Sequence, residues 1–290
     1  MCRLFGFKSV FQSQVNHSLI HAENALNAQS VKHPDGWGVG YYIQGAPHII
    51  KSPEAAFDDH IFQTVSGVVR SKTVLAHIRK ATQGSLNILN AHPFQFGRWI
   101  FAHNGNLKNF SAYKKDLRNL IDADLRPYIL GTTDSEMIFF VILSSLKNTF
   151  GSLDFSQIDT DLFALAIENA INSICKLSGE LYNKPDQDPK ENHITFILTN
   201  GEILCSLQAG QSIFFSTHKS QCPERNTCKF YNNSCESSSN SGQEINHLII
   251  SSEKMQGENI WTPMNNGQFI LIDSQMIFKT KNLNLPFSKN

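Results

Sequence analysis

Four short groups of residues in this 290-residue chain carry side chains that could act on a small molecule. In chain order they are Cys2, Arg79, Asn104 with Gly105, and Asp134. Removal of Met1, which the small Cys2 side chain permits, would leave a thiol and a free α-amine on one residue. That amine has a pKa of about 7.7–8.0 and can take the thiol proton, directly or through water, as a built-in general base. The alternative interpretation is a small buried cysteine at the start of an edge strand.

Arg79 belongs to the run His77-Ile78-Arg79-Lys80-Ala81-Thr82-Gln83-Gly84, which follows a predicted strand and ends in a glycine turn. A guanidinium at the end of a strand can hold a carboxylate through two parallel hydrogen bonds. The Thr82 hydroxyl can add a third. The alternative interpretation is a surface arginine followed by an ordinary turn.

Asn104 and Gly105 also follow a predicted strand, in Ala102-His103-Asn104-Gly105. An asparagine amide and a glycine N–H suit an oxyanion hole, and a glycine lets the backbone approach a substrate closely. An Asn-Gly turn between a strand and a helix is the alternative.

Asp134 stands in Thr132-Thr133-Asp134-Ser135-Glu136, at the predicted start of a helix. Its carboxylate could bind a substrate ammonium. The alternative is a helix N-cap with an acidic first turn, and a cap does not exclude binding.

The elements that must position these residues can be read from hydrophobic periodicity and turn residues. Asp134 or Ser135 is expected to cap its helix, and the Asn200-Gly201 dipeptide predicts a hairpin. Helices are predicted over residues 17–27, 53–65, 134–147 and 161–177. Strands are predicted over residues 3–10, 36–43, 73–79, 99–103, 193–199, 202–207, 212–216, 247–252, 268–273 and 276–279.

Strands and helices follow one another in runs, which predicts an α+β fold rather than a doubly wound parallel sheet. The segment 219–242 is rich in Ser, Asn and Cys and is expected to be a surface insertion or a disordered loop.

Taken together, these motifs resemble the class II glutamine amidotransferases of the N-terminal nucleophile hydrolase superfamily. The resemblance covers residues 2–146 strongly and resumes at 248–273. It is greatest to the standalone group, which includes amidotransferases without a synthase domain and the γ-glutamyl hydrolase of ergothioneine synthesis. That group's features stand here as Met1-Cys2-Arg3-Leu4-Phe5-Gly6, His33-Pro34-Asp35-Gly36-Trp37-Gly38, Asn90-Ala91-His92-Pro93-Phe94 and Ser252-Glu253.

The resemblance implies a single glutamine amidotransferase domain over residues 2–290 with a four-layer αββα fold. It implies that Cys2 is the nucleophile and that Asn104 and the Gly105 N–H bind the oxyanion. It further implies that Arg79, helped by Thr82, holds the α-carboxylate of a glutamine-like substrate, that Asp134 pairs with its α-ammonium, and that Asp35 and Trp37 shape the pocket wall. Gln83 stands where synthetase-linked members commonly carry His.

The implied reaction is hydrolysis of the γ-amide of glutamine or of a γ-glutamyl compound, with release of glutamate and ammonia or an amine. Because 290 residues leave no room for a fused synthase, one alternative is a glutaminase subunit that passes ammonia to a separate synthase partner. A second alternative is a non-catalytic γ-glutamyl-binding module. The intact set of Cys2, Arg79, Asn104 and Asp134 argues against that module.

Composition and the absence of long apolar runs limit which partners and which cellular location we expect. With 25 Lys+Arg against 25 Asp+Glu, the formal net charge is zero, and no basic stripe or charged tail predicts a nucleic-acid partner. No signal peptide and no apolar run of about 20 residues is present, so we expect a cytoplasmic protein with no membrane partner. A homo-oligomer is compatible with this composition.

The remaining cysteines and histidines predict no cofactor and no metal. His77, His92 and His103 lack the carboxylate companions and spacing of a zinc site, and we expect them to be core or supporting residues. Cys222, Cys228 and Cys235 are expected to be loop thiols without a role, with a zinc site or a disulfide as the alternatives. Cys175 and Cys205 are predicted to lie in the core.

Overall fold

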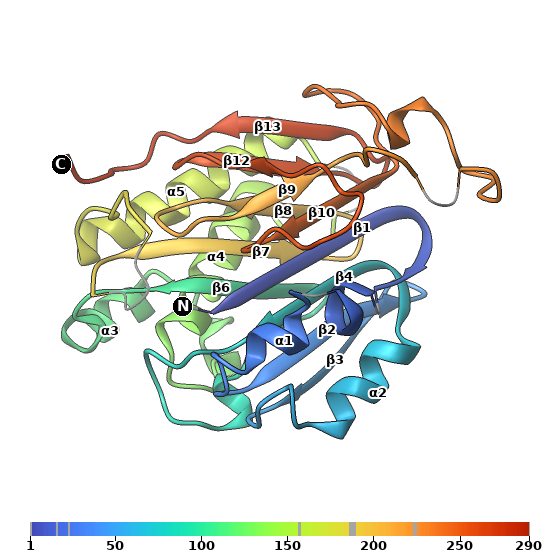
Figure 1. Ribbon diagram of the computed structural model, residues 1–290. Helices are drawn as coiled ribbons and strands as arrows, with labels where there is room; N and C mark the ends of the chain where they lie inside the picture. Colours follow the sequence, from blue (N-terminus) through green and yellow to red (C-terminus); the bar gives the residue numbers. More distant parts are fainter. Residues whose placement is uncertain are drawn as a thin grey trace.

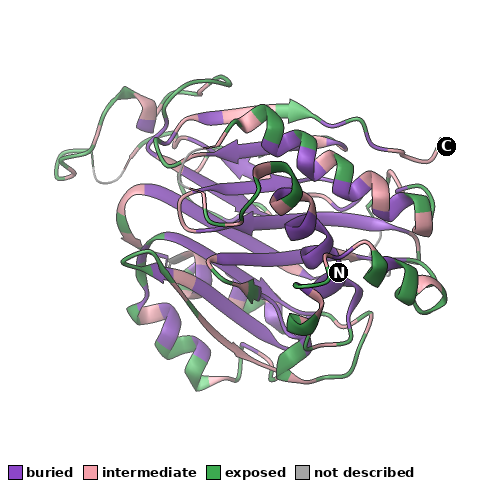
Figure 2. Cartoon of the chain, turned by 180° about the vertical axis from the view of Figure 1, so that it is seen from behind, coloured by how far each residue is buried: buried purple, intermediate pink, exposed green. Residues whose placement is uncertain are grey.

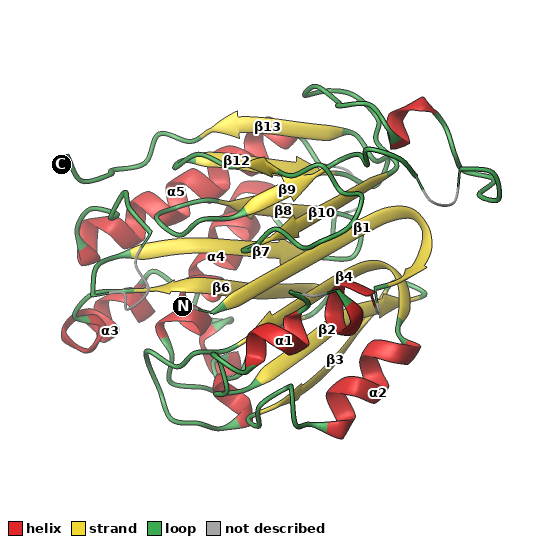
Figure 3. Ribbon diagram, in the orientation of Figure 1, coloured by secondary structure: helices red, strands yellow, loops and turns green. Residues whose placement is uncertain are grey.

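The computed structural model of the protein has two β-sheets stacked face to face, with helices on both outer surfaces (Figures 1 and 3). Met1, whose removal is predicted above, lies outside the described residues, as does Glu23 of the first predicted helix. The structure describes residues 2–15, 17–22, 24–155, 158–185, 190–222 and 225–289.

The first sheet has seven strands in the order β11-β9-β10-β1-β4-β2-β3, and its paired strands run antiparallel. β1 lies at its centre, where Arg3 is opposite Ile78 of β4 and Phe5 is opposite Ser251 of β10. Cys2 is therefore attached to the most enclosed strand of this sheet. The strands are β1 (Arg3–Gln14), β2 (Trp37–Ile43), β3 (Ala46–Ser52), β4 (Arg70–Ile78), β9 (Phe214–Ser216), β10 (His247–Ser251) and β11 (Thr262–Pro263).

The second sheet has six antiparallel strands in the order β13-β12-β8-β7-β6-β5. Successive side chains of its strand β6 point to opposite faces of the sheet, and both faces are buried. Ile100 and Ala102 pack toward the first sheet, whereas Trp99 and Phe101 pack toward the helices. The strands are β5 (Phe94–Phe96), β6 (Trp99–Asn106), β7 (His193–Thr199), β8 (Leu204–Leu207), β12 (Gln268–Ile272) and β13 (Phe278–Asn282).

Helices cover the outer face of each sheet. α4 (Asp134–Phe150) and α5 (Thr160–Ser178) pack on the second sheet, and α1 (Leu26–Ser30) and α2 (His60–Val68) pack on the first. Figure 2 shows the strands mostly buried and the outer helix faces exposed. The predicted α+β class and four-layer αββα sandwich are confirmed. The remaining helical elements are a π-helix (His17–His21), α3 (Phe110–Asn119) and the 3₁₀ turns Ile88–Asn90, Arg126–Tyr128 and Asn233–Cys235.

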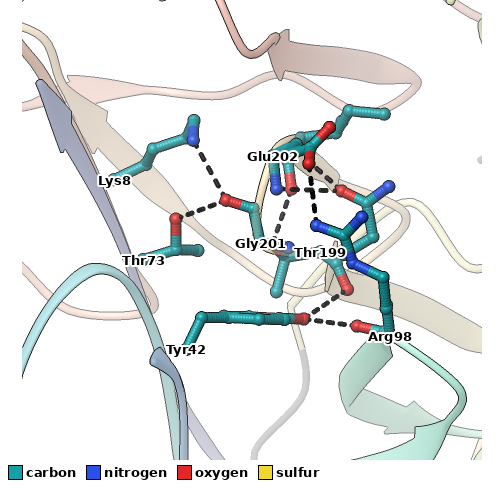
Figure 4. Close-up of polar contacts among 9 residues, drawn as sticks. Lys8, Tyr42, Thr73, Arg98, Thr199, Gly201 and Glu202 are labelled. Atoms are coloured by element: carbon teal, nitrogen blue, oxygen red, sulfur yellow. Dashed lines mark hydrogen bonds and ion pairs between the residues drawn. The ribbon is translucent and has the colours of Figure 1, made fainter. Parts of the chain in front are cut away.

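A polar cluster joins the two sheets at the turn between β7 and β8 (Figure 4). The Gly201 carbonyl accepts hydrogen bonds from Lys8 Nζ at 3.2 Å and from the Thr73 hydroxyl at 2.9 Å. Gly201 has φ +90°, and a Cβ there would lie 2.6 Å from the Tyr42 ring, so this position requires glycine. Burial, followed by the charge of Lys72, lowers the pKa of Lys8 to about 8.

Several predicted element boundaries are wrong. Pro53 does not open a helix: α2 begins at His60, after Asp59 accepts a hydrogen bond from the Ile61 N–H at 2.8 Å. α4 is capped by Thr133, whose hydroxyl accepts from the Glu136 N–H, so Asp134 is the first helical residue rather than the cap. The helix predicted over residues 17–27 is two short pieces. β3, β5 and α3 were not predicted at all.

The segment 219–242 contains one 3₁₀ turn, Asn233–Cys235, and otherwise turns and irregular backbone in its described part. The three cysteines of this segment are free thiols. No helix in the described part of the chain has the length and apolar character needed to cross a membrane.

Candidate active site

Cys2 is fixed by the strand that follows it. The Leu4 N–H donates to the Ser252 hydroxyl at 3.0 Å, and Arg3 forms an ion pair with Glu253. The Cys2 thiol is 8% exposed and lies 3.3 Å from both the N–H and the carbonyl oxygen of Lys80. The start of β1 is thus held between the end of β4 and residues 252–253.

The environment of the Cys2 thiol favours its neutral form. Burial raises the pKa of Cys2, while the hydrogen bond from the Lys80 backbone and the charges of Arg79 and Arg3 act in the opposite direction. Because burial is the largest of these effects, reaction through the thiolate requires a proton acceptor close to the sulfur.

Arg79 follows the last residue of β4 and is only 3% exposed. Its guanidinium donates to the carbonyl oxygens of Gln83 at 2.8 Å and Ser85 at 3.3 Å. It forms no ion pair with any residue that the structure describes. Burial lowers the pKa of Arg79, opposed by the nearby Cys2 thiol and the carboxyl groups of Asp35 and Asp134. A buried cation held by carbonyls alone is a good receptor for an anion.

Asp35 fixes the backbone on both sides of Arg79. Its N–H donates to the Arg79 carbonyl at 3.2 Å, and its carboxylate accepts from the Ala81 N–H at 2.8 Å. The Arg79 N–H donates to the neighbouring Gly36 carbonyl at 2.7 Å. Asp35 therefore supports the arginine rather than lining the space in front of it.

The loop after Arg79 is tied to the second sheet. Gln83 donates from its side-chain amide to Asn106 of β6 at 3.0 Å. Asn90 donates to the Ser85 carbonyl at 3.0 Å and accepts from the Thr132 N–H at 2.8 Å. Thr82 is exposed at the edge of the same loop. These contacts connect the arginine loop to the end of β6 and to the segment before α4.

Asn104 and Gly105 lie at the end of β6. Asn104 is 2% exposed, and its side-chain oxygen is buried with no hydrogen-bond partner among the described residues. A Cβ at Gly105 would lie 1.9 Å from the His193 carbonyl oxygen and 2.4 Å from His103 Nε2. Only glycine fits this position, because β7 and the histidine ring approach so closely.

Asp134 is 1% exposed at the start of α4, and both of its carboxylate oxygens accept backbone hydrogen bonds. The donors are the Leu107 N–H at 2.7 Å and the Ser135 N–H at 2.8 Å. A carboxylate has about four lone-pair sites, so capacity for a ligand ammonium remains. Beside it, His103 Nε2 lies 3.0 Å from the His193 carbonyl and therefore carries the proton, which leaves Nδ1 to accept from the Ser135 hydroxyl at 2.9 Å.

The structure brings five of the eight predicted site residues to one small cavity of about 20 Å³. This volume has room for about one water molecule. Asn104 lies beside Gly105 without lining it, and Asp35 and Trp37 lie outside it. Trp37 is fully buried against Phe62 and donates to Asp59 at 2.8 Å. The lining residues are Cys2, Arg79, Lys80, Thr82, Gln83, His92, His103, Gly105, Thr133, Asp134 and Ser135.

Two lining residues, His92 and His103, were assigned by sequence reasoning only to the core or to supporting roles. His92 packs against His77 with the two rings tilted by 35° and their centroids 4.2 Å apart, and neither ring has a hydrogen-bond partner among the described residues. Burial lowers the pKa of both well below the usual value. The motif Asn90-Ala91-His92-Pro93-Phe94 was the available signal. No cluster of His, Cys, Asp or Glu in the described part of the chain is arranged to hold a metal ion.

Comparisons with known proteins agree with this geometry. A family model described as class-II glutamine amidotransferases matches residues 1–288. A Haemophilus influenzae protein named "Putative glutamine amidotransferase" is 30% identical over 250 residues, which is 82% of this chain and 73% of that protein. The γ-glutamyl-hercynylcysteine sulfoxide hydrolase of Mycobacterium tuberculosis is 34% identical over 115 residues, which is 36% of this chain and 49% of that enzyme.

Solved structures show the same fold. A class-II glutamine aminotransferase domain protein from Silicibacter pomeroyi superposes with a TM-score of 0.59 at 17% identity, covering 97% of this chain and 99% of that one. Glutamine phosphoribosylpyrophosphate amidotransferase from B. subtilis gives a TM-score of 0.59 at 15% identity, over 98% of this chain and 49% of that one. The chain is therefore an enzyme of the class II glutamine amidotransferase family, with the N-terminal nucleophile hydrolase fold.

Proposed function

We propose that this enzyme hydrolyses the γ-amide of glutamine or of a γ-glutamyl compound through a thioester on Cys2. The observation that carries the proposal is the single cavity on which the Cys2 thiol, the buried Arg79 guanidinium and the Asp134 carboxylate converge. The Arg79 cation, which has no carboxylate partner among the described residues, can bind the α-carboxylate of an amino acid. The Asp134 carboxylate can bind the α-ammonium of the same amino acid. Holding both charged groups would direct the γ-carbonyl toward the thiol, and positioning of this kind contributes many kcal/mol.

The proposed reaction begins once Met1 has been removed. The free α-amine of Cys2 takes the thiol proton, and the thiolate attacks the γ-carbonyl carbon. The Asn104 amide and the Gly105 N–H stabilise the negative oxygen that forms. The carbon–nitrogen bond then breaks as the α-ammonium returns its proton to the leaving nitrogen, which departs as ammonia or an amine. A water molecule, deprotonated by the same amine, attacks the thioester, and glutamate and the free thiol are released.

The small size of the cavity bears on how a substrate enters. About 20 Å³ does not hold a glutamyl group. The loop of Thr82 and Gln83 forms one wall and is partly exposed, so we expect it to move outward on binding and to return to exclude water.

The direct test is a glutamate-release assay on purified protein, with glutamine and a series of γ-glutamyl peptides as substrates. We expect intact-mass measurement to show loss of Met1, and Cys2→Ala to abolish release. Cys175→Ala, which removes a buried thiol on α5, is the matched control and should retain activity if it stays folded. Full retention of Met1 in an active preparation, or activity in Cys2→Ala, would show that another group is the nucleophile.

The same assay separates the alternatives. A glutaminase subunit that delivers ammonia would release glutamate only after a synthase partner is added. A binding module would bind glutamate without any release. Comparing kcat/KM across the peptide series would identify the preferred leaving group, because the residues proposed to bind the substrate would contact only its glutamyl half.

A further inference from the structure

A large cavity lies away from Cys2, toward the opposite end of β1. It has a volume of about 560 Å³, within the range of small-molecule sites. It lies between the second half of β1 and the segment 219–242, which extends beside the end of β1 in Figure 1. The β1 residues that line it begin at Phe7, five residues beyond Cys2, and none of its described lining residues also lines the Cys2 cavity. The cavity is thus separate from the proposed catalytic site.

An irregularity in β1 opens this space. Lys8 pairs with Thr73 of β4, but the next paired residue, Ser13, lies opposite Ser71. Five steps along β1 therefore correspond to two along β4, and the residues between are released from pairing with β4, although Ser9 still pairs with His247 of β10. Bulges of this kind bend a strand and redirect its side chains. Here Phe11 packs on Phe230 of the segment 219–242, and Ser9 and Gln12 also line the cavity.

The charged side chains that line the cavity are basic, as far as the structure describes the chain. They are those of Arg70 and Lys219, and no Asp or Glu is among the described lining residues. Neither basic side chain forms an ion pair with a residue that the structure describes. The chain as a whole has zero formal net charge, so the two basic residues give the described lining a local positive excess. It creates a positive potential that attracts an anion.

The rest of the lining mixes polar and apolar side chains, and its apolar part includes three phenylalanines and Ile249. Phe11 and Phe230 stack with ring centroids 5.4 Å apart and an interplanar angle of 10°. Phe7 and Ile249, which are 8% and 6% exposed, come from the neighbouring strands β1 and β10. A flat apolar group would bury its faces against these side chains.

Two lining residues also hold unused hydrogen-bonding capacity. His247 Nε2 and Asn259 Oδ1 are buried without a partner among the described residues. Buried polar atoms of this kind are uncommon, because each costs free energy until it is paired. A ligand that carries a polar group beside its apolar body could pair with them after a small side-chain rotation.

We propose that this cavity is a second ligand site, which takes a small organic anion with an aromatic or other flat apolar body. The anionic group would lie near Arg70 and Lys219, and the apolar body would pack on Phe11, Phe230 and Ile249. This inference does not depend on the hydrolase mechanism, since none of these residues lines the Cys2 cavity.

Two fluorescent probes of nearly equal shape test the proposal on the full chain. 1-Anilinonaphthalene-8-sulfonate is an aromatic anion, and N-phenyl-1-naphthylamine is the same skeleton without the charge. We expect saturable binding of one sulfonate per chain, at least about tenfold tighter than binding of the neutral probe. Arg70→Gln and Lys219→Gln should each weaken sulfonate binding about fivefold or more, since each removes one positive charge from the cavity. Lys115→Gln, at an exposed site on α3, is the matched control.

The cysteines of the segment 219–242 report whether the probe occupies this cavity. Cys222 and Cys228 line it and are partly exposed. Saturating sulfonate should slow their alkylation by iodoacetamide at least about threefold, as measured by mass spectrometry of the corresponding peptides. Unchanged alkylation would place the probe elsewhere and overturn the proposal. Equal affinity for the neutral probe, or charge variants that bind like Lys115→Gln, would overturn the assignment of an anion.

Discussion

The Cys2 cavity and the proposed second ligand site lie toward opposite ends of β1 and are built in different ways. At the small one, backbone groups hold the charged side chains: Arg79 by two carbonyls and Asp134 by two amides. At the large one, Arg70 and Lys219 form no ion pair with the described residues, and part of the wall comes from an irregular segment. The small cavity is therefore preorganised for one geometry, whereas the large one selects by charge and shape. Backbone anchoring is what distinguishes the site proposed for catalysis.

The largest effect is expected from replacing Arg79, the cation that backbone carbonyls hold in the small cavity. Arg79→Gln should lower kcat/KM for glutamate release from glutamine by about 10²–10³-fold, mostly through KM, because the substrate α-carboxylate loses a buried, charge-assisted partner. Glutamine α-amide, which lacks that carboxylate, is the matched substrate. It should be a poor substrate for the wild-type enzyme, and its kcat/KM should fall only slightly further in the variant. If kcat/KM fell equally for the two substrates, Arg79 would not contact the α-carboxylate.

A smaller effect is expected at the backbone itself. In Gly105→Ala the new Cβ would meet the His193 carbonyl, so β6 and β7 must separate where the oxyanion is expected to bind. We expect a loss of about 1–3 kcal/mol in the free energy of unfolding, together with a large fall in kcat.

Gly67→Ala is the matched control, since a Cβ at this position of α2 meets nothing within 4 Å. It should stabilise the protein by about 0.5–1 kcal/mol through the helix propensity of alanine. If Gly105→Ala has the same free energy of unfolding and the same kcat as the wild-type enzyme, the close approach of β7 does not constrain the site.

The last expected effect leaves activity aside and concerns how stability changes with pH at Lys8 of β1. Its folded-state pKa of about 8 is below the unfolded value of about 10.4, so the unfolded chain binds the extra proton between these pH values. The free energy of unfolding should therefore rise as pH increases through this window, by at most about 3 kcal/mol. Lys8→Met should flatten that rise in urea-unfolding series at pH 7.5, 9 and 10.5. If the free energy of unfolding changed with pH in the same way in both proteins, burial would not lower the pKa of Lys8.

Sequence patterns predicted the parts of the molecule that depend on local signals. β1, β4, β6, β7, α4 and α5 have strong periodicity, and the motifs of Cys2, Arg79, Asn104 and Asp134 come at element ends, where topology can gather them. β3 was missed because this edge strand is half exposed and contains a proline. The cap of α4 was misplaced by one residue because Thr133, Asp134 and Ser135 are all good capping types.

Other features had no local signal. Trp37 was predicted to shape the pocket wall, but its place beneath α2 depends on Asp59 and Phe62, which lie more than 20 residues further along the chain. The lining of the large cavity comes from four separate parts of the chain, represented by Phe11, Arg70, Lys219 and His247, so no single stretch of sequence predicts it.

The central place of β1 also makes the position of the Cys2 thiol depend on distant parts of the chain. The strand that follows Cys2 is completed by β10, and Leu4 is held by Ser252, 248 positions later. A fragment that lacks β10 lacks the partner that fixes the start of β1 in place. The site proposed for catalysis is therefore expected to be lost in such a fragment, even though the fragment retains Cys2, Arg79 and Asp134.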